Sequence, residues 1–188
     1  MDQVRILAIT GSLREGSFNR QLAMAAKEAL GDDAEFTLLE FADLPMMNED
    51  IEFPAPQAVK RVREAVKAAD GIWFFTPEYN HSFPGVLKNL IDWLSRRISA
   101  DEPQVLAHKP AAISGITTGM SGTGIAQDHL VTLISYLNMD VMNAPRLTIP
   151  NALLQADEEG KLILSAMSKE RLQKQAAAFT AFIRSRKG

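Results

Sequence analysis

Three segments of this chain gather hydroxyl, amide and charged side chains of the kind that hold a small ligand. The first, Gly11–Arg20, follows an apolar run and leads into a helical pattern. The first N–H groups of a helix lack intrahelical partners and carry partial positive charge, so this arrangement predicts a phosphate cradle. The segment also supplies hydrogen-bond donors, a forked guanidinium and a glycine where the backbone can bend, on Ser12, Arg14, Gly16, Ser17 and Asn19.

This first segment matches neither of the common nucleotide-binding motifs. It lacks the lysine of GxxxxGK[ST] and the glycine spacing of GxGxxG, which weakens a triphosphate or a Rossmann-type dinucleotide interpretation. An ordinary strand-to-helix turn capped by Ser17 is the alternative to a phosphate site.

The second segment, Pro77–Gly85, suits a planar heteroaromatic ring. Pro77 stiffens the turn, Tyr79 offers an aromatic face, and Asn80 can pair with an imide edge as donor and acceptor together. We expect Glu78 to bind through its backbone amide, with its carboxylate turned toward solvent or a partner subunit, because a negative charge beside the ring would oppose reduction. The alternative is that Tyr79 only covers the start of the next helix.

The third segment, Gly115–Gly124, is rich in glycine and threonine. Backbone N–H groups of Thr117, Thr118 and Gly119 could donate to a ring carbonyl, which would favour a ring that becomes negative on reduction. A glycine-rich connection that needs positive φ angles is the alternative.

Acid–base, metal and thiol chemistry have little support in the sequence. His81 at the mouth of the second segment could contact substrate, with a solvated surface role as the alternative. No histidines and carboxylates have metal-ligand spacing, and no GxSxG elbow is present. The chain has no cysteine, which excludes disulfides and thiolate catalysis. We therefore predict no catalytic side chain and no metal, and redox chemistry would need a bound cofactor.

Length and charge restrict the class of protein further. A chain of 188 residues predicts one domain over residues 1–188. The formal net charge of −3 is neither the basic excess of a nucleic-acid binder nor the acidity of many small electron carriers. No leader precedes the first apolar run, and no apolar run is long enough to span a bilayer. We predict a cytoplasmic protein with no nucleic-acid partner and no membrane insertion.

Apolar, β-rich runs alternate with helical patterns along the chain. We expect strands at Val4–Thr10, Glu35–Leu39, Gly71–Thr76, Ala111–Ile116, and weakly at Asp140–Met142 with Leu147–Ile149, where prolines indicate a split or edge element. We expect helices at Asn19–Leu30, Pro56–Ala69, Pro84–Arg97, Gly124–Leu137 and Ser168–Lys187. Such alternation is typical of parallel strands joined by right-handed helical crossovers. The predicted fold class is α/β, a three-layer, doubly wound, five-stranded parallel sheet.

Sheets of this class bind ligands at the carboxyl ends of their strands. The three polar segments follow the first, third and fourth predicted strands, so we expect them to form three walls of one pocket. Leu44–Pro56 is a long loop punctuated by proline, and such a loop in a compact domain is often functional.

The blocks GSLREGSFNR, TPEYNHSFPGVLKNLIDWLSR and AQDHL together resemble the NADPH-dependent FMN reductase family, in particular its quinone and chromate reductase branch. The resemblance runs from the first strand to about Pro150. It implies a flavodoxin-like fold, bound FMN, and NADPH or NADH as co-substrate. By position, it implies that the FMN phosphate is held by Ser12, Arg14, Ser17, Phe18 and Asn19. It also implies that the ring is flanked by Glu78, Tyr79, Asn80 and His81, with Thr117 beside the flavin.

Some positions depart from the family pattern. Relatives commonly have a tyrosine where this chain has His81. The helix after the third segment commonly carries two arginines and a tyrosine, where this chain has Ile125, Val131 and Asp128. Because these positions are expected near subunit contacts and the acceptor site, the resemblance leaves the acceptor and a tetramer open.

The pattern of the Pro84–Arg97 helix predicts self-association. Trp93 and Leu94 flank its apolar stripe, which gives more apolar surface than one sheet face would cover. We expect a homodimer in which this helix pairs with Gly124–Leu137, and a homotetramer is the alternative assembly.

Together these features predict an FMN-dependent NAD(P)H oxidoreductase. It would pass hydride through bound FMN to a quinone, chromate, azo or free-flavin acceptor in two half-reactions. Two alternatives stay open at this point: a flavodoxin-type electron carrier, which would use the same phosphate loop, and a non-catalytic flavin-binding protein.

Overall fold

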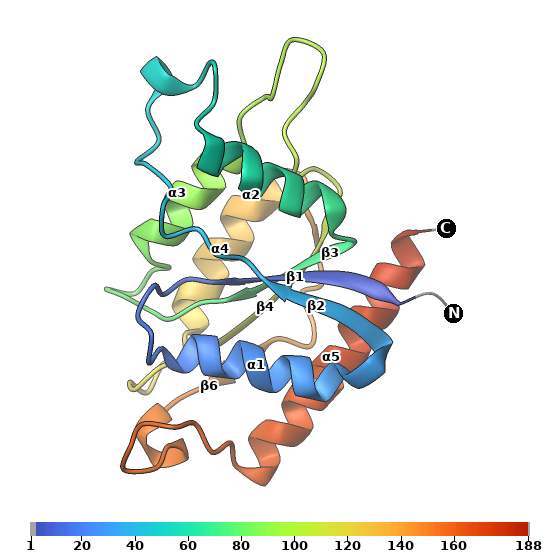
Figure 1. The fold of residues 1–188 in the computed structure, drawn as a ribbon. Helices are drawn as coiled ribbons and strands as arrows, with labels where there is room; N and C mark the ends of the chain where they lie inside the picture. Colours follow the sequence, from blue (N-terminus) through green and yellow to red (C-terminus); the bar gives the residue numbers. More distant parts are fainter. Residues whose placement is uncertain (1–2, 188) are drawn as a thin grey trace.

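The fold of residues 3–187 is described by a computed structural model. One parallel sheet has the strand order β2-β1-β3-β4-β5, and β6 also pairs with β4 (Figure 1). The strands are β1 (Val4–Thr10), β2 (Ala34–Leu38), β3 (Gly71–Phe75), β4 (Pro110–Ile116), β5 (Asp140–Val141) and β6 (Leu147–Ile149). This order confirms the predicted flavodoxin-like, doubly wound fold.

The predicted split of the last strand is confirmed. The start of β4 pairs with β5, through Pro110 and Asp140, whereas its end pairs with β6, through Ser114 and Leu147. Pro145 lies in the interruption and has no N–H to donate to a ladder. The side-chain amide of Gln175 donates to the Pro145 carbonyl at 3.0 Å and so satisfies an acceptor that the interruption leaves outside the ladder.

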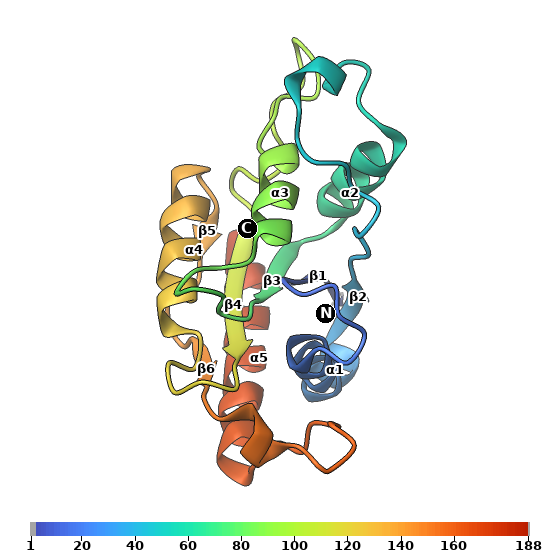
Figure 2. The same ribbon diagram turned by 90° about the vertical axis from the view of Figure 1, so that its left-hand side faces the viewer.

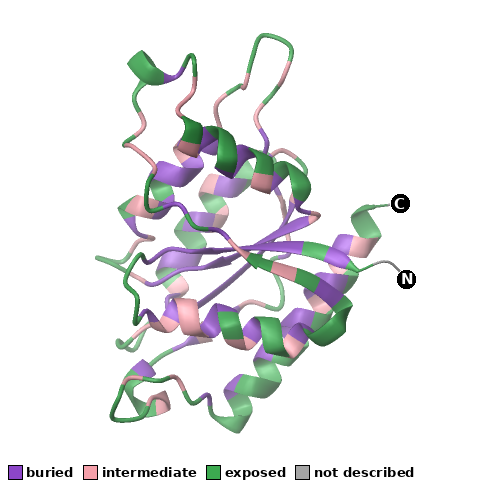
Figure 3. Cartoon of the chain, viewed as in Figure 1, coloured by how far each residue is buried: buried purple, intermediate pink, exposed green. Residues whose placement is uncertain are grey.

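Helices cover both faces of the sheet (Figure 2). Two of them, α1 (Phe18–Leu30) and α5 (Ala166–Arg186), lie on one face, and α2 (Gln57–Ala68), α3 (Gly85–Leu94) and α4 (Gly124–Tyr136) lie on the other. Successive side chains of a strand point to opposite faces. In β3, Trp73 and Phe75 therefore join the α1/α5 core, while Ile72 and Phe74 join the other core. Figure 3 shows β1, β3 and β4 largely buried between these layers, whereas β2 is partly exposed.

Short 3-10 helices occupy three of the connections, and serine caps fix two of the long helices. The 3-10 helices are Gly31–Asp33, Glu49–Ile51 and Ala152–Gln155. Helix α5 begins two residues before the predicted Ser168, because the Ser165 side chain accepts from the Ser168 N–H.

Helix α3 is shorter and better covered than predicted. It ends at Leu94, and the following Arg96 forms a bidentate ion pair with buried Glu52, at 2.9 and 2.8 Å. Trp93 and Leu94 are fully buried, so the apolar excess predicted for this helix is wrong. The loop before α2 covers it: the Trp93 indole N–H and the Asn89 amide both donate to the Pro45 carbonyl, at 2.8 and 2.9 Å.

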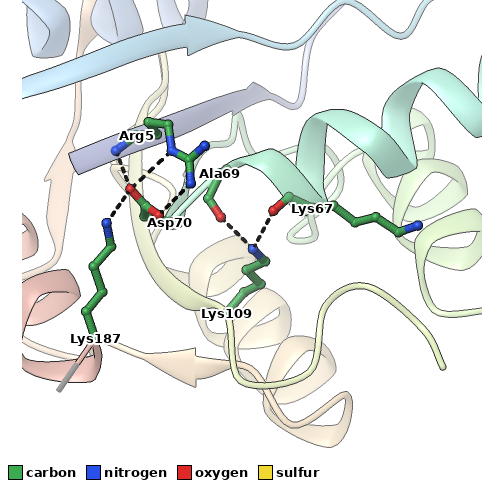
Figure 4. A network of polar contacts seen from close by, with 6 residues as sticks. All are labelled: Arg5, Lys67, Ala69, Asp70, Lys109 and Lys187. Carbon is green, nitrogen blue, oxygen red and sulfur yellow. Dashed lines mark hydrogen bonds and ion pairs between the residues drawn. The ribbon is translucent and has the colours of Figure 1, made fainter. Parts of the chain in front are cut away.

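Asp70 joins the two ends of the chain at the amino-terminal edge of the sheet (Figure 4). Its carboxylate accepts from the Arg5 backbone N–H at 2.8 Å, pairs with the Arg5 guanidinium at 3.1 Å and pairs with Lys187 Nζ at 2.7 Å. Burial of this carboxyl favours its neutral form, but the hydrogen bonds and charges of Arg5 and Lys187 outweigh burial and lower the pKa of Asp70 to about 2. Lys109 beside it donates to the last carbonyls of α2, those of Lys67 and Ala69.

This network predicts a pH-dependent contribution to stability. Asp70→Asn should lower the free energy of unfolding by about 1–2 kcal/mol at pH 7. The folded-state pKa of Asp70 lies below its ordinary value of 3.8. The difference in the free energy of unfolding between wild type and Asp70→Asn should therefore be largest above pH 3.8 and should vanish as pH falls toward about 2. Urea unfolding at several pH values measures it, with exposed Asp33→Asn as the control. A difference that is constant with pH would contradict the role of Asp70.

Candidate functional site

The three polar segments start from the carboxyl edge of the sheet, as predicted, but only the first two line the cavity at that edge, so the expectation of one pocket with three walls is wrong. Parallel register brings the ends of β1, β3 and β4 side by side. The Gly11 N–H donates to the Phe75 carbonyl at 2.8 Å, and the Thr76 N–H donates to the Ser114 carbonyl at 3.0 Å. These bonds extend the ladders beyond the strands, so the three loops begin from one rigid edge.

Asn19 ties the first loop to the end of β4. Its amide nitrogen donates to the Ile116 carbonyl at 2.8 Å, and its amide oxygen accepts from the Ile116 N–H at 3.1 Å. The side chain is buried and both of its polar atoms are used. The end of β4 therefore uses the amide oxygen and one of the two amide N–H groups of Asn19, and the Asn19 backbone N–H has no intrahelical acceptor.

The rest of the first loop keeps the features of an anion site. Ser17 is the N-cap of α1, so the capped-turn interpretation holds as well, although its contact with the Arg20 N–H is long, at 3.4 Å. The N–H groups of Phe18 and Asn19 belong to the first turn, which has no intrahelical acceptor for them. The Arg14 guanidinium lies over the Phe18 ring at 5.9 Å, and no carboxylate within residues 3–187 forms an ion pair with it.

Ser12 and Gly16 shape this loop around Arg14. The Ser12 hydroxyl accepts from the Arg14 N–H at 3.4 Å. The sequence predicts that Gly16 lets the backbone bend, but the φ angle of Gly16 is not in the left-handed region that favours glycine. A Cβ at Gly16 would instead lie 2.9 Å from the Arg14 guanidinium, so the glycine provides space for that side chain.

The second loop forms a tight reverse turn. The N–H of Tyr79 donates to the Ser82 carbonyl at 2.9 Å, and the Ser82 N–H donates to the Tyr79 carbonyl at 3.0 Å. Asn80 and His81 between them have positive φ angles of 51° and 58°. The turn leaves the Tyr79 ring and the Asn80 and His81 side chains exposed, and Pro77 before it is buried. Three potential ligand contacts therefore stand on a rigid support.

Glu78 does not point to solvent, and that expectation is wrong. Its carboxylate, only 6% exposed, accepts from the Ala126 N–H at 3.0 Å. Burial favours the neutral carboxyl, but hydrogen bonds from the Ala126 N–H and the Ser121 hydroxyl outweigh it and keep the pKa of Glu78 below its ordinary value. The physical reason is the start of α4, which needs an acceptor and obtains it from this loop.

The third loop presents fewer N–H groups than expected. The Thr117 N–H donates to the Ile149 carbonyl at 3.0 Å, so it cannot donate to a ligand and that part of the prediction is wrong. The Thr117 hydroxyl accepts a long hydrogen bond from Gly119, at 3.4 Å. Thr118 and Gly119 are exposed. The loop can therefore offer the N–H of Thr118 and the hydroxyl hydrogen of Thr117.

A cavity of about 530 Å³ opens beside the first and second loops. It is mainly apolar, and its walls come from four parts of the chain: Gly11–Arg14, Phe41–Ala42 with Leu44 and Met46, Tyr79, and Pro84–Val86 with Asn89. The sequence singled out the 44–56 loop only by its length and prolines and did not indicate this wall. A larger cavity of about 650 Å³ lies between α1 and α5 and contains none of the predicted site residues.

One neighbour of the site carries no local sequence signal. His129 of α4 lies with Nδ1 3.3 Å from the Ser82 hydroxyl, although the two residues are 47 positions apart. Within residues 3–187, no group of three or more histidine and acidic side chains suits a metal ion, and no helix is long and apolar enough to cross a membrane.

Comparison with known families decides what kind of enzyme uses this arrangement. Residues 4–153 match the model of the NADPH-dependent FMN reductase family. The chain belongs to this family. It is therefore an oxidoreductase that uses FMN and NAD(P)H, as the sequence blocks predicted.

Individual relatives in this family align along the whole chain. An NAD(P)H-dependent FMN reductase of Pseudomonas aeruginosa is 40% identical, over 100% of this chain and 99% of that protein. A 2-hydroxy-1,4-benzoquinone reductase of a Burkholderia species is 35% identical, over 98% of each. The solved structure of FerB, an NAD(P)H:(acceptor) oxidoreductase from Paracoccus denitrificans, has a TM-score of 0.87 at 30% identity and covers 97% of this chain and 98% of FerB.

Gly115 before the third loop gives a test of how tightly this edge is packed. A Cβ at Gly115 would lie 2.0 Å from the Thr123 hydroxyl and 2.4 Å from the Thr76 carbonyl. Gly115→Ala should therefore lower the free energy of unfolding by about 3 kcal/mol. Gly124→Ala, whose added Cβ has no atom within 4 Å, is the matched control and should be neutral or stabilising by up to about 1 kcal/mol. Denaturant unfolding measures both, and equal effects would contradict this packing.

Proposed function

We propose that the first loop holds the phosphate of FMN. The observation that carries this proposal is the Arg14 guanidinium, which has no carboxylate partner in residues 3–187 and stands beside the start of α1. A phosphate there would accept from Arg14, from the Ser12 and Ser17 hydroxyls, and from the N–H groups of Phe18 and Asn19. Gly16 leaves room for the guanidinium beside the phosphate.

We further propose that the flavin ring lies between the second and third loops. The exposed aromatic face of Tyr79 would contact the flavin ring, and the side-chain amide of Asn80 would pair with the imide edge of that ring. The N–H of Thr118 and the Thr117 hydroxyl hydrogen would face the ring from the other side. His81, which is 77% exposed, stands at the mouth, and Pro77 packs the base of the turn against Gly11.

The acceptor that this site suits best is a quinone. Bound FMN supplies the hydride transfer between NAD(P)H and the acceptor. The chain's own part is to bind and orient the reactants and to keep water away, and the apolar side chains of Phe41, Leu44 and Met46 beside Tyr79 suit a quinone ring better than a small oxyanion. The quinone reductases among the relatives support this class. We expect the protein to work in the cytoplasm, with its supply of NAD(P)H.

We also propose a homodimer formed through α4. The apolar surface now rests on different residues from those predicted, because Trp93 and Leu94 are buried inside the chain. Tyr136 and Ile125, at the two ends of α4, are 83% and 41% exposed and give this helix an apolar surface that a second copy could cover.

Binding of FMN and riboflavin tests the phosphate assignment. Arg14→Ala should raise the Kd for FMN about 10–100-fold, through loss of a charged hydrogen bond, and leave the Kd for riboflavin unchanged. The control is Arg61→Ala, which removes a cation of α2 that pairs with Asp43. It should change neither Kd. Quenching of flavin fluorescence measures these values. Equal affinity of the wild type for FMN and riboflavin would contradict the assignment.

Steady-state turnover tests the acceptor. NADPH or NADH oxidation by the FMN-loaded protein should be faster with a benzoquinone than with chromate, an azo dye or free FMN at equal concentration. Met46→Asp should raise the KM for the quinone and leave the rate of nicotinamide oxidation with ferricyanide unchanged, because it alters only the apolar wall. Flavin binding without oxidation of either nicotinamide would identify an electron carrier or a non-catalytic flavin-binding protein instead.

Light scattering tests the dimer. The wild type should be a dimer at micromolar concentration, and Tyr136→Glu should raise the dissociation constant about tenfold or more, because it places a charge in an apolar interface. Met167→Glu alters an apolar residue of α5 that is also exposed, at 70%, and serves as the control. A monomeric wild type would rule out this assembly.

A further inference from the structure

We propose that Glu78 is a positioning residue of the flavin site. Its buried carboxylate ties the turn that carries Tyr79 to the start of α4, and this tie fixes the spacing between the second and third loops. The inference rests on the proposed function, because these loops are the walls between which the flavin ring would lie.

Helix α4 begins without a cap of its own. Thr123 is its N-cap residue but has a left-handed backbone, with φ 70°, and its side chain caps no N–H. The Thr123 hydroxyl instead accepts from the Gln127 amide at 3.0 Å. The Gly124 N–H reaches the Ser121 carbonyl at 3.1 Å, so the N–H groups of Ile125 and Ala126 need an acceptor from outside the helix.

Glu78 supplies that acceptor from another loop. One carboxylate oxygen accepts from the Ala126 N–H at 3.0 Å, and the Ser121 hydroxyl and the Ile125 N–H help to keep the pKa of this carboxyl below its ordinary value. The other oxygen lies 3.5 Å from His81 Nδ1. A carboxylate at this end of a helix is favoured by the unpaired N–H groups and by the helix dipole, which together offset its charge. Glu78 can therefore stand next to a reducible ring without presenting an uncompensated negative charge to it.

The tie connects two parts that are each rigid. On one side, two reciprocal hydrogen bonds close the turn between Tyr79 and Ser82. On the other side, Gly115 packs against Thr123 so closely that no Cβ would fit. The exposed segment 118–121 leads from the end of β4 toward α4, and the hydrogen bond from the Ala126 N–H to Glu78 fixes the helix start that follows this segment. Without the carboxylate, α4 would start frayed and this segment would lose its position relative to Tyr79.

The test compares Glu78→Ala, Glu78→Gln and Glu78→Asp in the full-length protein. The control is Ser165→Ala, which removes the cap of α5, a helix that makes no hydrogen bond to Glu78. We expect Glu78→Ala to raise the Kd values for FMN and riboflavin by the same factor, about tenfold, because the ring walls and not the phosphate site are disturbed. Arg14→Ala, in contrast, should affect FMN alone. Glu78→Gln, which keeps the length and one acceptor, should restore part of the loss.

Two further measurements separate positioning from stability. Glu78→Ala should change the visible circular dichroism of bound flavin and accelerate hydrogen exchange at Ile125 and Ala126, whereas Ser165→Ala should lower Tm and leave the flavin signal unchanged. If Glu78→Ala lowers Tm but leaves flavin affinity and dichroism as in the wild type, Glu78 is a structural cap only and the inference is overturned. If the wild type binds neither FMN nor riboflavin, the proposed function itself fails.

Discussion

Unpaired N–H groups at two helix starts are the constraint on which the carboxyl edge of the sheet depends. Both α1 and α4 begin at this edge, and each begins with N–H groups that the helix cannot satisfy. The chain resolves the two cases in opposite ways. At α4 it supplies the buried carboxylate of Glu78, whereas at α1 it supplies only the weak Ser17 contact and adds the cation of Arg14. The start of α1 is therefore left able to take an anion, and the start of α4 becomes part of the support.

The end of β4 is the point from which the three loops take their relative positions. Ile116 exchanges two hydrogen bonds with the Asn19 side chain, which fixes the first loop. Because Gly115 has no side chain, the Thr123 hydroxyl and the Thr76 carbonyl both occupy the space that a methyl group would fill. This close packing brings the second and third loops together. These contacts are polar or sterically exclusive, so they specify one arrangement where apolar packing would allow several.

The long loop before α2 has two roles that depend on each other. Its Pro45 carbonyl accepts from Asn89 and Trp93, and Glu52 pairs with Arg96, so the loop is held along α3 and buries the apolar side of that helix. The same anchoring leaves Leu44 and Met46 at the wall of the cavity beside Tyr79. Helix α3 thus needs no partner subunit to cover Trp93, and the covering loop contributes the surface that an apolar acceptor would contact.

The sequence by itself determined the strand–helix alternation, the split last strand, the family and the three loops of the site, because hydrophobic periodicity, proline, glycine and local motifs act over a few residues. It did not determine which polar groups are consumed internally. From the sequence, the side chain of Asn19 and the N–H of Thr117 are expected to face a ligand, and the carboxylate of Glu78 to face solvent or a partner subunit, yet Ile116, Ile149 and Ala126 form hydrogen bonds with them. Their partners lie 97, 32 and 48 positions away along the chain. Only tertiary structure brings such partners together, because hydrogen-bond satisfaction is settled between segments that pairing of the strands places side by side.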